Sequence, residues 1–480
     1  MPRVLLINAA EPEETRAALV EEGRLVEYRR ERAAAAKLVG NIYLGRVVNI
    51  ERGIGAAFVD CGMGRNAFLH VSDCLPAAPG LPERIEERFP VGERVLVQVT
   101  REPLGDKGPV LTAHVSLPGR FLVLLPFAEA GGVSRRMEGE GKEDLRALAR
   151  ELERREQAGL IVRTAAATAT KRELVRDLRL LRKLWAAIEA RSRTAQPPAL
   201  LHSEGDLVGR ALRDLADRDV DEIHADTPEA LAHARETLLA MEPTLASRLR
   251  LHAGPQPLFH AFGIEEECDL VHARRVPLPG GGSLVFDRTE AMVTVDVNSG
   301  RTRHEEGLEE TAFQTDLEAA AEVARQIRLR NLGGVIAIDF IDLRERSRVR
   351  EVERTLHDHL RRDRSRVRTG RMGPFGVYVL TRRRAGDGSE GGLGGCPHCG
   401  GPGPVPEPLD TALRVYRELS SRPRHASLLA RLDPAAARLL LASREAALRG
   451  QEGGGRRRLR VVADPALPPG VWEVEPLRAP

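Results

Sequence analysis

The clearest hydrophobic pattern lies between residues 293 and 343, where two apolar runs flank a long amphipathic stretch. The runs VTVDVNSGR (293–301) and VIAIDFIDL (335–343) are alternating or continuous in β-branched residues, as in buried strands. Between them, TAFQTDLEAAAEVARQIRLR (311–330) is typical of a helix. The pattern therefore predicts a strand, a helix and a second strand.

The other patterns predict a mixture of strands and helices. Residues 1–36 are expected to form a strand (4–8), a charged helix (11–23) and another strand (24–31), and residues 37–118 are short β-runs punctuated by glycine. Further predictions are strands at 121–127 and 159–164, a helix at 171–191, alternating helix and strand over 213–270, and a mostly helical tail over 406–480.

Each central strand carries a carboxylate, Asp296 or Asp339. A buried, unpaired Asp is costly, so such residues are usually paired, hydrogen-bonded or bound to a metal. Asn298 lies two positions beyond Asp296, on the same strand face, and can donate to the carboxylate. Two interpretations are open at this point. Asp296 caps a turn and Asp339 pairs with a nearby arginine, or the two acids form a magnesium site.

Composition narrows the class of protein. The 480 residues suffice for roughly two to four domains, and a hydrophobic fraction of 42% can fill their cores. The net charge of +3 excludes a polybasic tail binder. Isolated cysteines, the lack of a signal peptide and the lack of any apolar run long enough to span a membrane favour a cytoplasmic location.

The glycine-punctuated strands of residues 37–118 suggest a small barrel. The run NIYLGRVVNI, with AAFVDCG and NAFLHVSD after it, looks like an OB-fold RNA-binding domain. Phe58 and Phe68 are then candidates for stacking on bases, and Lys107 is a candidate phosphate contact. Alternatively, the two phenylalanines simply fill a small core.

Arginine supplies two further candidate phosphate sites. Residues 343–373 are unusually rich in arginine, which fits either a solvated helix face or phosphate binding. Arg163 and Thr164 place a guanidinium and a hydroxyl side by side at a strand end, a pair that can bind a terminal phosphate.

The motif CPHCGG places Cys396 and Cys399 on a tight knuckle after a glycine-rich linker. A structural zinc site needs four ligands, so a second chain would have to supply the other pair and form a dimer. A redox dithiol or a half-occupied site is the alternative, although the βαβ context of redox motifs is missing.

Together these motifs resemble the ribonuclease E/G family of bacterial endoribonucleases. The resemblance covers nearly the whole chain in the family's element order, and in length and tail sequence it is nearer to the ribonuclease G branch. The matching motifs are LLINA, the OB-fold pattern, AGGVSRRMEG, GLIVRT, DVNSGR, LGGVIAIDFIDL and CPHCGG.

The resemblance implies a multidomain α/β and α+β fold. An RNase H-like domain would hold an inserted OB-fold barrel and a 5′ sensor, and a DNase I-like catalytic subdomain, a zinc-link and a small C-terminal domain would follow. The implied boundaries are RNase H-like 1–36 and 213–270, OB-fold 37–118, 5′ sensor 119–212, DNase I-like 271–390, zinc-link 391–405 and C-terminal oligomerisation domain 406–480.

The resemblance also implies a chemistry. Asp296 and Asp339 would bind Mg²⁺ with Asn298 orienting Asp296, and a water would attack an RNA phosphodiester in line, leaving 5′-phosphate and 3′-hydroxyl ends. Asp342 should point to a different face. The implied 5′-monophosphate pocket consists of Gly119, Val123, Arg163, Thr164 and Arg366, and the implied zinc-link joins two protomers through Cys396 and Cys399.

The expected partners are single-stranded RNA, as ribosomal precursors and messengers, and a second copy of the chain, with a dimer of dimers left open. Pro374 and Val379 stand where the family typically carries charged residues, which affects the expected RNA path. Two other functions are weighed against the nuclease. One is a non-catalytic RNA-binding scaffold, and the other is a metal-dependent DNase.

Overall fold

The computed structural model divides the chain into two compact units, which we describe separately. Unit 1 comprises Met1–Arg32, Asp221–Leu231 and Arg250–Pro480, and unit 2 comprises Ala33–Val220 and Ala232–Leu249. The structure describes residues 2–33, 38–75, 84–85, 89–103, 108–128, 130–134, 141–289, 291–300, 307–373, 375–383, 393–395, 404–422, 427–449 and 459–477. Within these residues, no helix is long and apolar enough to cross a membrane.

The first sheet of unit 1 has the strand order β15-β14-β1-β2-β3. Strand β1 pairs in parallel with β14 and antiparallel with β2, so the sheet joins the two segments expected to form one domain. The elements are β1 (Arg3–Glu11), β2 (Glu14–Glu21), β3 (Arg24–Arg32), β14 (Glu222–Ala225), β15 (Leu249–Leu251), α6 (Leu258–Ala261) and α7 (Glu265–Leu270).

The helix predicted over residues 11–23 is wrong, because most of this segment forms strand β2. It pairs with β1 on one side and β3 on the other, and its Ala17 to Val20 are buried. Glu22 and Gly23, with φ of 54° and 77°, form a two-residue turn that matches the twist of a hairpin. Pairing on both edges therefore outweighs the helical propensity of Glu and Ala.

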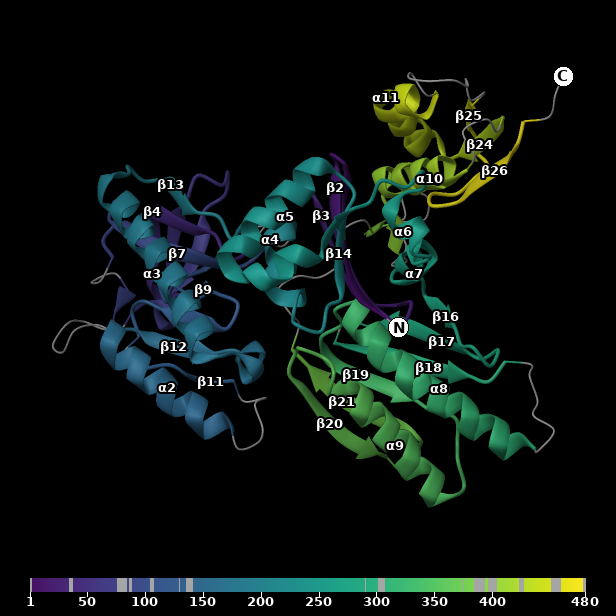
Figure 1. The fold of residues 1–480 in the computed structure, drawn as a ribbon, viewed down its shortest axis with the longest axis horizontal. Helices are drawn as coiled ribbons and strands as arrows, with labels where there is room; N and C mark the ends of the chain where they lie inside the picture. The colour runs from purple at the N-terminus through teal and green to yellow at the C-terminus, as the bar shows by residue number, and fades with distance from the viewer. Residues whose placement is uncertain are drawn as a thin grey trace. The chain divides into compact units, whose positions relative to one another are not determined.

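The second sheet of unit 1 has the order β16-β17-β18-β19-β21-β20. Helices α8 and α9 run along one face of it (Figure 1), and their inward side chains share a core with alternate strand residues. The elements are β16 (Arg275–Pro277), β17 (Ser283–Arg288), β18 (Met292–Asn298), α8 (Leu308–Leu329), β19 (Gly334–Asp339), α9 (Arg346–Leu360), β20 (Val367–Met372) and β21 (Val377–Arg382). The predicted strand–helix–strand unit is confirmed.

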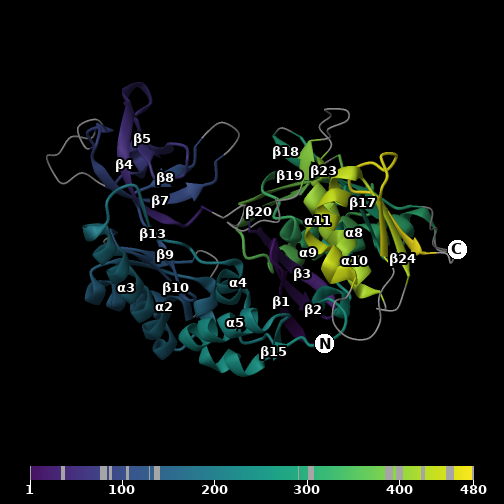
Figure 2. The same cartoon turned by 90° about the horizontal axis from the view of Figure 1, so that it is seen from above.

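The C-terminal part of unit 1 is an α/β layer rather than the mostly helical tail predicted. Helices α10 and α11 lie beside a three-stranded sheet of order β25-β24-β26 (Figure 2). Strand β25, near the end of the segment predicted to be helical, pairs in parallel with β24. The elements are β22 (Leu393–Gly395), β23 (Pro404–Pro406), α10 (Pro408–Ser421), β24 (Leu428–Leu432), α11 (Pro434–Arg449), β25 (Leu459–Ala463) and β26 (Trp472–Pro476).

Unit 2 begins with the predicted small barrel. Its strands follow the order β4-β5-β6-β8-β7, and a pairing of β4 with β7 closes the ring, which is consistent with an OB-like fold. A sixth strand, β13, adds to the outer edge of β4. The strands are β4 (Ile42–Glu51), β5 (Ala56–Asp60), β6 (Ala67–His70), β7 (Arg94–Arg101), β8 (Val110–Thr112) and β13 (Ala199–His202).

The rest of unit 2 packs helices on a small sheet of order β11-β12-β10-β9. The predicted helix over 171–191 is confirmed as α3, and helix α2 was not predicted because its sequence is dominated by charged residues. The elements are β9 (Leu117–Pro118), β10 (Leu122–Leu125), β11 (Gly132–Val133), α2 (Gly141–Glu156), β12 (Gly159–Val162), α3 (Lys171–Thr194), α4 (Leu207–Leu215) and α5 (Pro228–Met241), which starts in unit 1.

A buried ion pair fixes the end of β21 in the second sheet. The Arg382 guanidinium donates to Asp363 Oδ2 (2.6 Å), to Asn331 Oδ1 (2.8 Å) and to the Leu332 carbonyl (2.7 Å). Both charged side chains are almost fully buried. Loss of the arginine would leave the Asp363 carboxylate buried with its partner gone.

We therefore expect Arg382→Leu to lower the free energy of unfolding by about 3–5 kcal/mol. The measurement is urea denaturation followed by circular dichroism. Arg383→Leu is the matched control, because Arg383 is the next residue and its side chain is exposed. Equal effects of the two substitutions would contradict a structural role for the buried pair.

Candidate functional site

The two strand carboxylates are neighbours in the second sheet. Strands β18 and β19 pair in parallel, and Asp296 is the register partner of Asp339. Register partners on adjacent strands lie about 4.8 Å apart across the sheet and project from the same face. Both acids lie at the carboxyl ends of their strands, so the fold brings together the two residues that the sequence singled out.

The carboxylates lie on the face of the sheet opposite α8 and α9. Val293, Val295 and Val297 point toward the helices and are buried, whereas Asp296 and Asp339 are exposed. The expectation of a buried acid is therefore wrong. Apolar runs bury only one face of this sheet, and solvent reaches the other. An exposed pair of oxygen ligands is accessible to a hydrated cation and to a phosphate.

Asn298 lies where the sequence predicted, beside Asp296. Its Nδ2 donates to Asp296 Oδ2 at 2.7 Å. Close backbone packing holds the strand end that carries both residues. Gly300 has a φ of 70°, and a Cβ there would approach the Gly281 carbonyl to 2.4 Å. A side chain at Gly300 would therefore push the end of β18 away from the neighbouring loop.

Asp316, which no sequence motif marks, is a buried acid behind the exposed pair. It comes from α8, and its Oδ1 accepts the N–H of Ile341, two residues beyond Asp339. Its Oδ2 has no hydrogen-bond partner within the described residues. Burial, and to a lesser degree the charge of Asp342, raise the pKa of Asp316 to about 7. Asp342 itself is exposed, near Gly376.

The donor set of the exposed pair suits a hard cation. Carboxylate oxygens are the ligands that Mg²⁺ prefers, and Mg²⁺ is commonly held by one or two carboxylates together with substrate phosphates and waters. No group of three or more acidic, histidine or cysteine side chains that could enclose an ion occurs in the described part of the chain. The chemistry of two neighbouring carboxylates is compatible with a Mg²⁺ ion that also binds waters and a phosphate.

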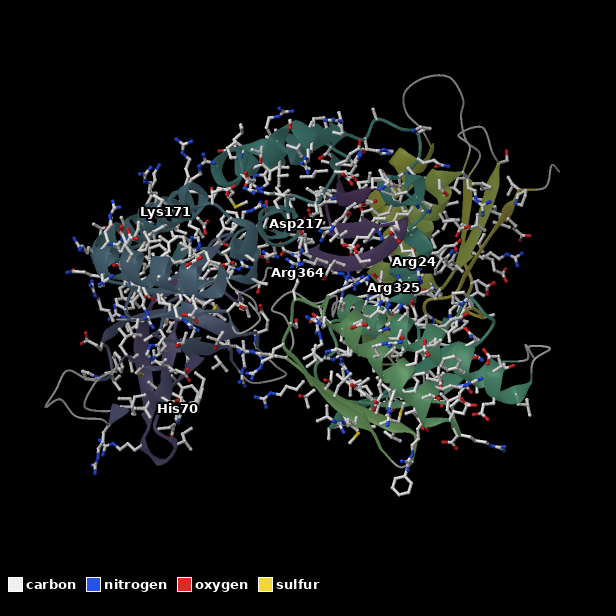
Figure 3. The ribbon with its side chains drawn as sticks, turned by 60° about the horizontal axis from the view of Figure 1, so that its bottom comes forward. Arg24, His70, Lys171, Asp217, Arg325 and Arg364 are labelled. Carbon is white, nitrogen blue, oxygen red and sulfur yellow. The ribbon has the colours of Figure 1, made fainter. Side chains whose placement is uncertain are left out.

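The barrel of unit 2 carries three neighbouring rings on β5 and β6. Phe58 is the register partner of Phe68, and their ring centroids are 5.9 Å apart in an edge-to-face arrangement. His70, labelled in Figure 3, lies two residues along β6 from Phe68, and the two rings are stacked with centroids 6.5 Å apart. All three side chains are half-buried. The rings are therefore partly packed in the core and partly exposed to solvent. His70 lies beside the two phenylalanines that the sequence predicted as stacking residues.

Four of the residues predicted to bind a 5′-phosphate lie in unit 2, around β10 and β12. The Arg163 N–H donates to the Phe121 carbonyl (2.8 Å), which ties Arg163 to the start of β10. The Arg163 guanidinium donates to the Gly119 carbonyl and to Asp214 Oδ1 (2.7 Å). Thr164 Oγ1 lies 3.1 Å from Ser134 Oγ. Gly119, Arg163 and Thr164 thus form one cluster, and Val123 lies on β10 opposite Ile161.

Two acids that the sequence analysis missed hold this cluster. Asp177 is buried on α3 and accepts the N–H groups of Arg120 (3.1 Å), Phe121 (2.9 Å) and Leu122 (2.9 Å). Asp214 on α4 accepts from Arg163 as described. A carboxylate that receives backbone N–H groups fixes the path of a loop, so Asp177 sets where the Gly119 carbonyl stands. Neither acid carries a sequence motif that would have revealed it.

The remaining predicted site residues belong to unit 1 or lie outside the described residues. Arg366 is exposed and belongs to unit 1, whereas the other four sensor residues belong to unit 2. Lys107, Pro374, Cys396 and Cys399 lie outside the described residues. The short strands β22 and β23 pair on either side of the two cysteines in the sequence. The shared zinc ion and the dimer stay predictions.

The family model and three relatives that match this chain are those of ribonucleases E and G. The model of the ribonuclease E/G family matches residues 116–385. The chain is 39% identical to ribonuclease E of Haemophilus influenzae over 86% of its own length, but it spans only 45% of that relative. It is 38% identical to ribonuclease G of Escherichia coli and 37% identical to ribonuclease G of Salmonella typhimurium, in each case over 87% of this chain and 88% of the relative.

The raised pKa of Asp316 predicts a pH-dependent stability. Its carboxyl stays protonated in the folded state up to about pH 7, whereas the unfolded group has a pKa near 3.8. The protonated carboxyl therefore adds to the free energy of unfolding. This stabilisation is fully present below pH 4 and is lost as the pH rises through 7. The stability of the wild type relative to Asp316→Asn should fall by about 3 kcal/mol between pH 5 and pH 8.

The measurement is the free energy of unfolding of both proteins at several pH values. Only the difference between them is interpreted, because other groups titrate equally in both. A difference that stays constant with pH would show that Asp316 is ionised in the folded protein.

Proposed function

Because the chain belongs to the ribonuclease E/G family, we propose that it is a Mg²⁺-dependent endoribonuclease that cleaves single-stranded RNA. The observation that carries this proposal is the in-register pair Asp296 and Asp339 on an open sheet face, with Asn298 bonded to Asp296. The chain spans less than half of the ribonuclease E relatives, so the activity is proposed from this site and the family together.

The roles of the three residues follow from their chemistry. Asp296 and Asp339 would hold the cation between adjacent strands. Asn298 donates one amide N–H to Asp296 Oδ2 and so leaves the other oxygen of that carboxylate for the cation. A bound Mg²⁺ would supply Lewis-acid stabilisation of the phosphodiester and lower the pKa of a water. The expected products carry 5′-phosphate and 3′-hydroxyl ends.

The barrel supports RNA as the substrate. Aromatic rings on an OB-like barrel stack on bases without regard to sequence, and we assign this role to Phe58 and Phe68, whose rings are neighbours on β5 and β6. His70 stacks beside Phe68 and is a further proposed contact. Lys107 remains the proposed phosphate contact. We include ribosomal RNA processing and messenger RNA decay in the proposal as the cellular roles of such a nuclease.

The proposal extends to sensing of a 5′-monophosphate. Gly119 and Asp214 each accept one N–H of Arg163, so two donors of the guanidinium are fixed. Its remaining donors would then bind a terminal phosphate, and the Thr164 hydroxyl would donate to the same group while it accepts from Ser134 Oγ (3.1 Å). Val123 of β10 is the fourth proposed member of this cluster, and Arg366 stays a prediction from the sequence. In fold terms, we assign the first sheet to an RNase H-like domain and the second to a DNase I-like subdomain.

The first test concerns the metal site. Asp296→Asn and Asp339→Asn should each lower kcat for a short fluorescent RNA by about 10²-fold or more, because each loses a charged ligand whose contribution is worth several kcal/mol. Asn298→Ala should cost less, about 10–100-fold, because the amide only orients a ligand.

RNA binding in EDTA measured by fluorescence anisotropy is the control, and it should be unchanged in all three variants. Full cleavage by either Asp variant would refute the assignment. Binding without Mg²⁺-dependent cleavage by the wild type would favour a non-catalytic RNA scaffold, and equal cleavage of DNA would favour a general nuclease.

The second test concerns the 5′ sensor. Arg163→Gln should reduce the ratio of kcat/KM for 5′-monophosphate RNA to that for 5′-hydroxyl RNA by about 10–100-fold, the size of a lost charge-assisted contact. Asp214→Asn should reduce the same ratio by a smaller factor, because it loosens Arg163 without removing it.

The rate on 5′-hydroxyl RNA should stay within about twofold of the wild type in both variants. Lys171→Gln is the charge control, since Lys171 is an exposed residue of the same unit that pairs with Glu151. A fall in both rates by the same factor would point to misfolding or to general RNA binding instead of 5′ sensing.

A further inference from the structure

The hairpin between β20 and β21 exposes an aromatic ring to an unusual extent. Phe375 has 85% of its surface exposed, the highest fraction of any large hydrophobic residue in the described part of the chain. A single exposed hydrophobic residue needs no explanation by itself. Phe375 is of interest because its turn lies next to the strand that carries Asp339.

The turn that carries Phe375 is tied directly to the carboxylate strand. The Gly376 N–H donates to the Gly373 carbonyl (3.2 Å), which closes the turn, and the Gly376 carbonyl accepts the N–H of Phe340 (3.4 Å). Phe340 follows Asp339, and Val377 is the register partner of Asp339. Phe375 comes two positions before Val377, which is one strand spacing of about 4.8 Å from Asp339, so the turn lies beside the carboxylate strand.

Two arginines follow the same hairpin. Arg368 is the partner of Thr381, which itself pairs with Val335 on the open face. Arg371 lies in the irregular part of β20, next to Met372, and is exposed. Neither arginine has an ion-pair partner among the residues that the structure describes. Their side chains are therefore available to phosphates that pass along this edge of the sheet.

Charge determines which part of a nucleotide suits the turn and which part suits β20. The Asp342 carboxylate stands at the turn, with its Oδ1 3.1 Å from the position that a Cβ at Gly376 would occupy. A phosphate at the turn would be repelled by this carboxylate, whereas an uncharged base would not. The turn therefore suits a base stacked on Phe375, and β20 suits the phosphates.

We propose that the β20–β21 hairpin is a nucleotide-binding edge of the catalytic sheet, in which Phe375 stacks on a base next to the cleaved bond and Arg368 and Arg371 bind adjacent phosphates. The inference rests on the proposed function, because it places the RNA across the Asp296–Asp339 pair. Aromatic stacking combined with arginine is the usual means of holding single-stranded nucleic acid without sequence preference.

A protein partner is a poorer occupant of this edge. β20 is the outermost strand of its sheet, and its exposed arginines oppose pairing with another strand. The hairpin is also continuous with the open face that carries the carboxylates. A second copy of the chain covering Phe375 is nevertheless an outcome that the test below distinguishes.

The test measures binding of a fluorescent, 5′-hydroxyl single-stranded RNA to the full chain in EDTA. Phe375→Ala should weaken binding about 5- to 150-fold, the range for loss of one stacked base. Phe375→Leu should lose nearly as much, and Phe375→Trp should stay within about twofold. Phe375 makes few contacts in the folded chain, so the thermal midpoint should not change.

An RNA with one abasic nucleotide, moved along the strand, identifies the stacked base. One position should weaken binding to the wild type and have no further effect on Phe375→Ala. In Mg²⁺, that position should lie within one or two nucleotides of the cleavage site. An abasic penalty that is the same in both proteins would overturn the proposal, as would unchanged affinity of Phe375→Ala.

The arginines are tested by salt dependence. The double variant Arg368→Gln, Arg371→Gln should reduce the slope of log K against log salt concentration by about 1.4, two contacts at about 0.7 each. Phe375→Ala should leave the slope unchanged. Arg350→Gln removes one charge from exposed α9, on the other side of the sheet, and should leave both slope and affinity unchanged.

The outcomes separate this proposal from the proposed function. If the binding results hold but the wild type never cleaves RNA, the nucleotide edge stands and the catalytic assignment fails. If cleavage depends on Asp296 and Asp339 but the Phe375 and arginine variants bind normally, the edge fails alone. A lower molecular mass of Phe375→Ala in sedimentation, with RNA affinity unchanged, would instead assign the ring to a contact between copies.

Discussion

The parallel pairing of β18 with β19 is the constraint on which the proposed site depends. Parallel neighbours cannot be joined by a tight turn, so the chain must cross over, and here α8 makes the crossing. The crossover packs α8 on one face of the sheet and leaves the other face open. Register then places Asp296 next to Asp339. A shift of one residue would turn one carboxylate into the helix-covered core.

The crossover helix is in turn fixed to the first sheet of unit 1 by charged side chains. Arg325 donates to the Leu25 carbonyl (2.8 Å) and to Glu322 (2.7 Å), and Arg328 donates to the Val26 carbonyl (2.8 Å). Arg24 of β3 also reaches Glu322, at 3.1 Å, and Figure 3 shows Arg24 and Arg325 near each other. These guanidinium groups donate to backbone carbonyls of β3. The hydrogen bonds fix the position of α8 along that strand, in addition to the packing of its apolar side chains.

The sequence predicted the parts of the structure that depend on local pattern. The strand–helix–strand unit, the barrel and α3 follow from hydrophobic periodicity and glycine placement. Strand β2 did not, because its Glu- and Ala-rich sequence favours a helix and only pairing on both edges makes it a strand. Asp177, Asp214 and Asp316 could not be found either. Each of these acids accepts a hydrogen bond from a residue distant in the sequence. No local sequence pattern shows which acid will face which loop.

Three acids near the proposed site show how environment separates residues of one type. Asp296 and Asp339 stand on the open face, where water, a cation and a phosphate all have access. Asp316 stands behind them among buried side chains, where desolvation favours the neutral form and a backbone N–H is its one partner within the described residues. A buried acid cannot exchange ligands with solvent, so it can support the loop after Asp339 but not replace either member of the pair. The open face, which the hydrophobic pattern alone did not reveal, is therefore what makes the pair suitable for a metal.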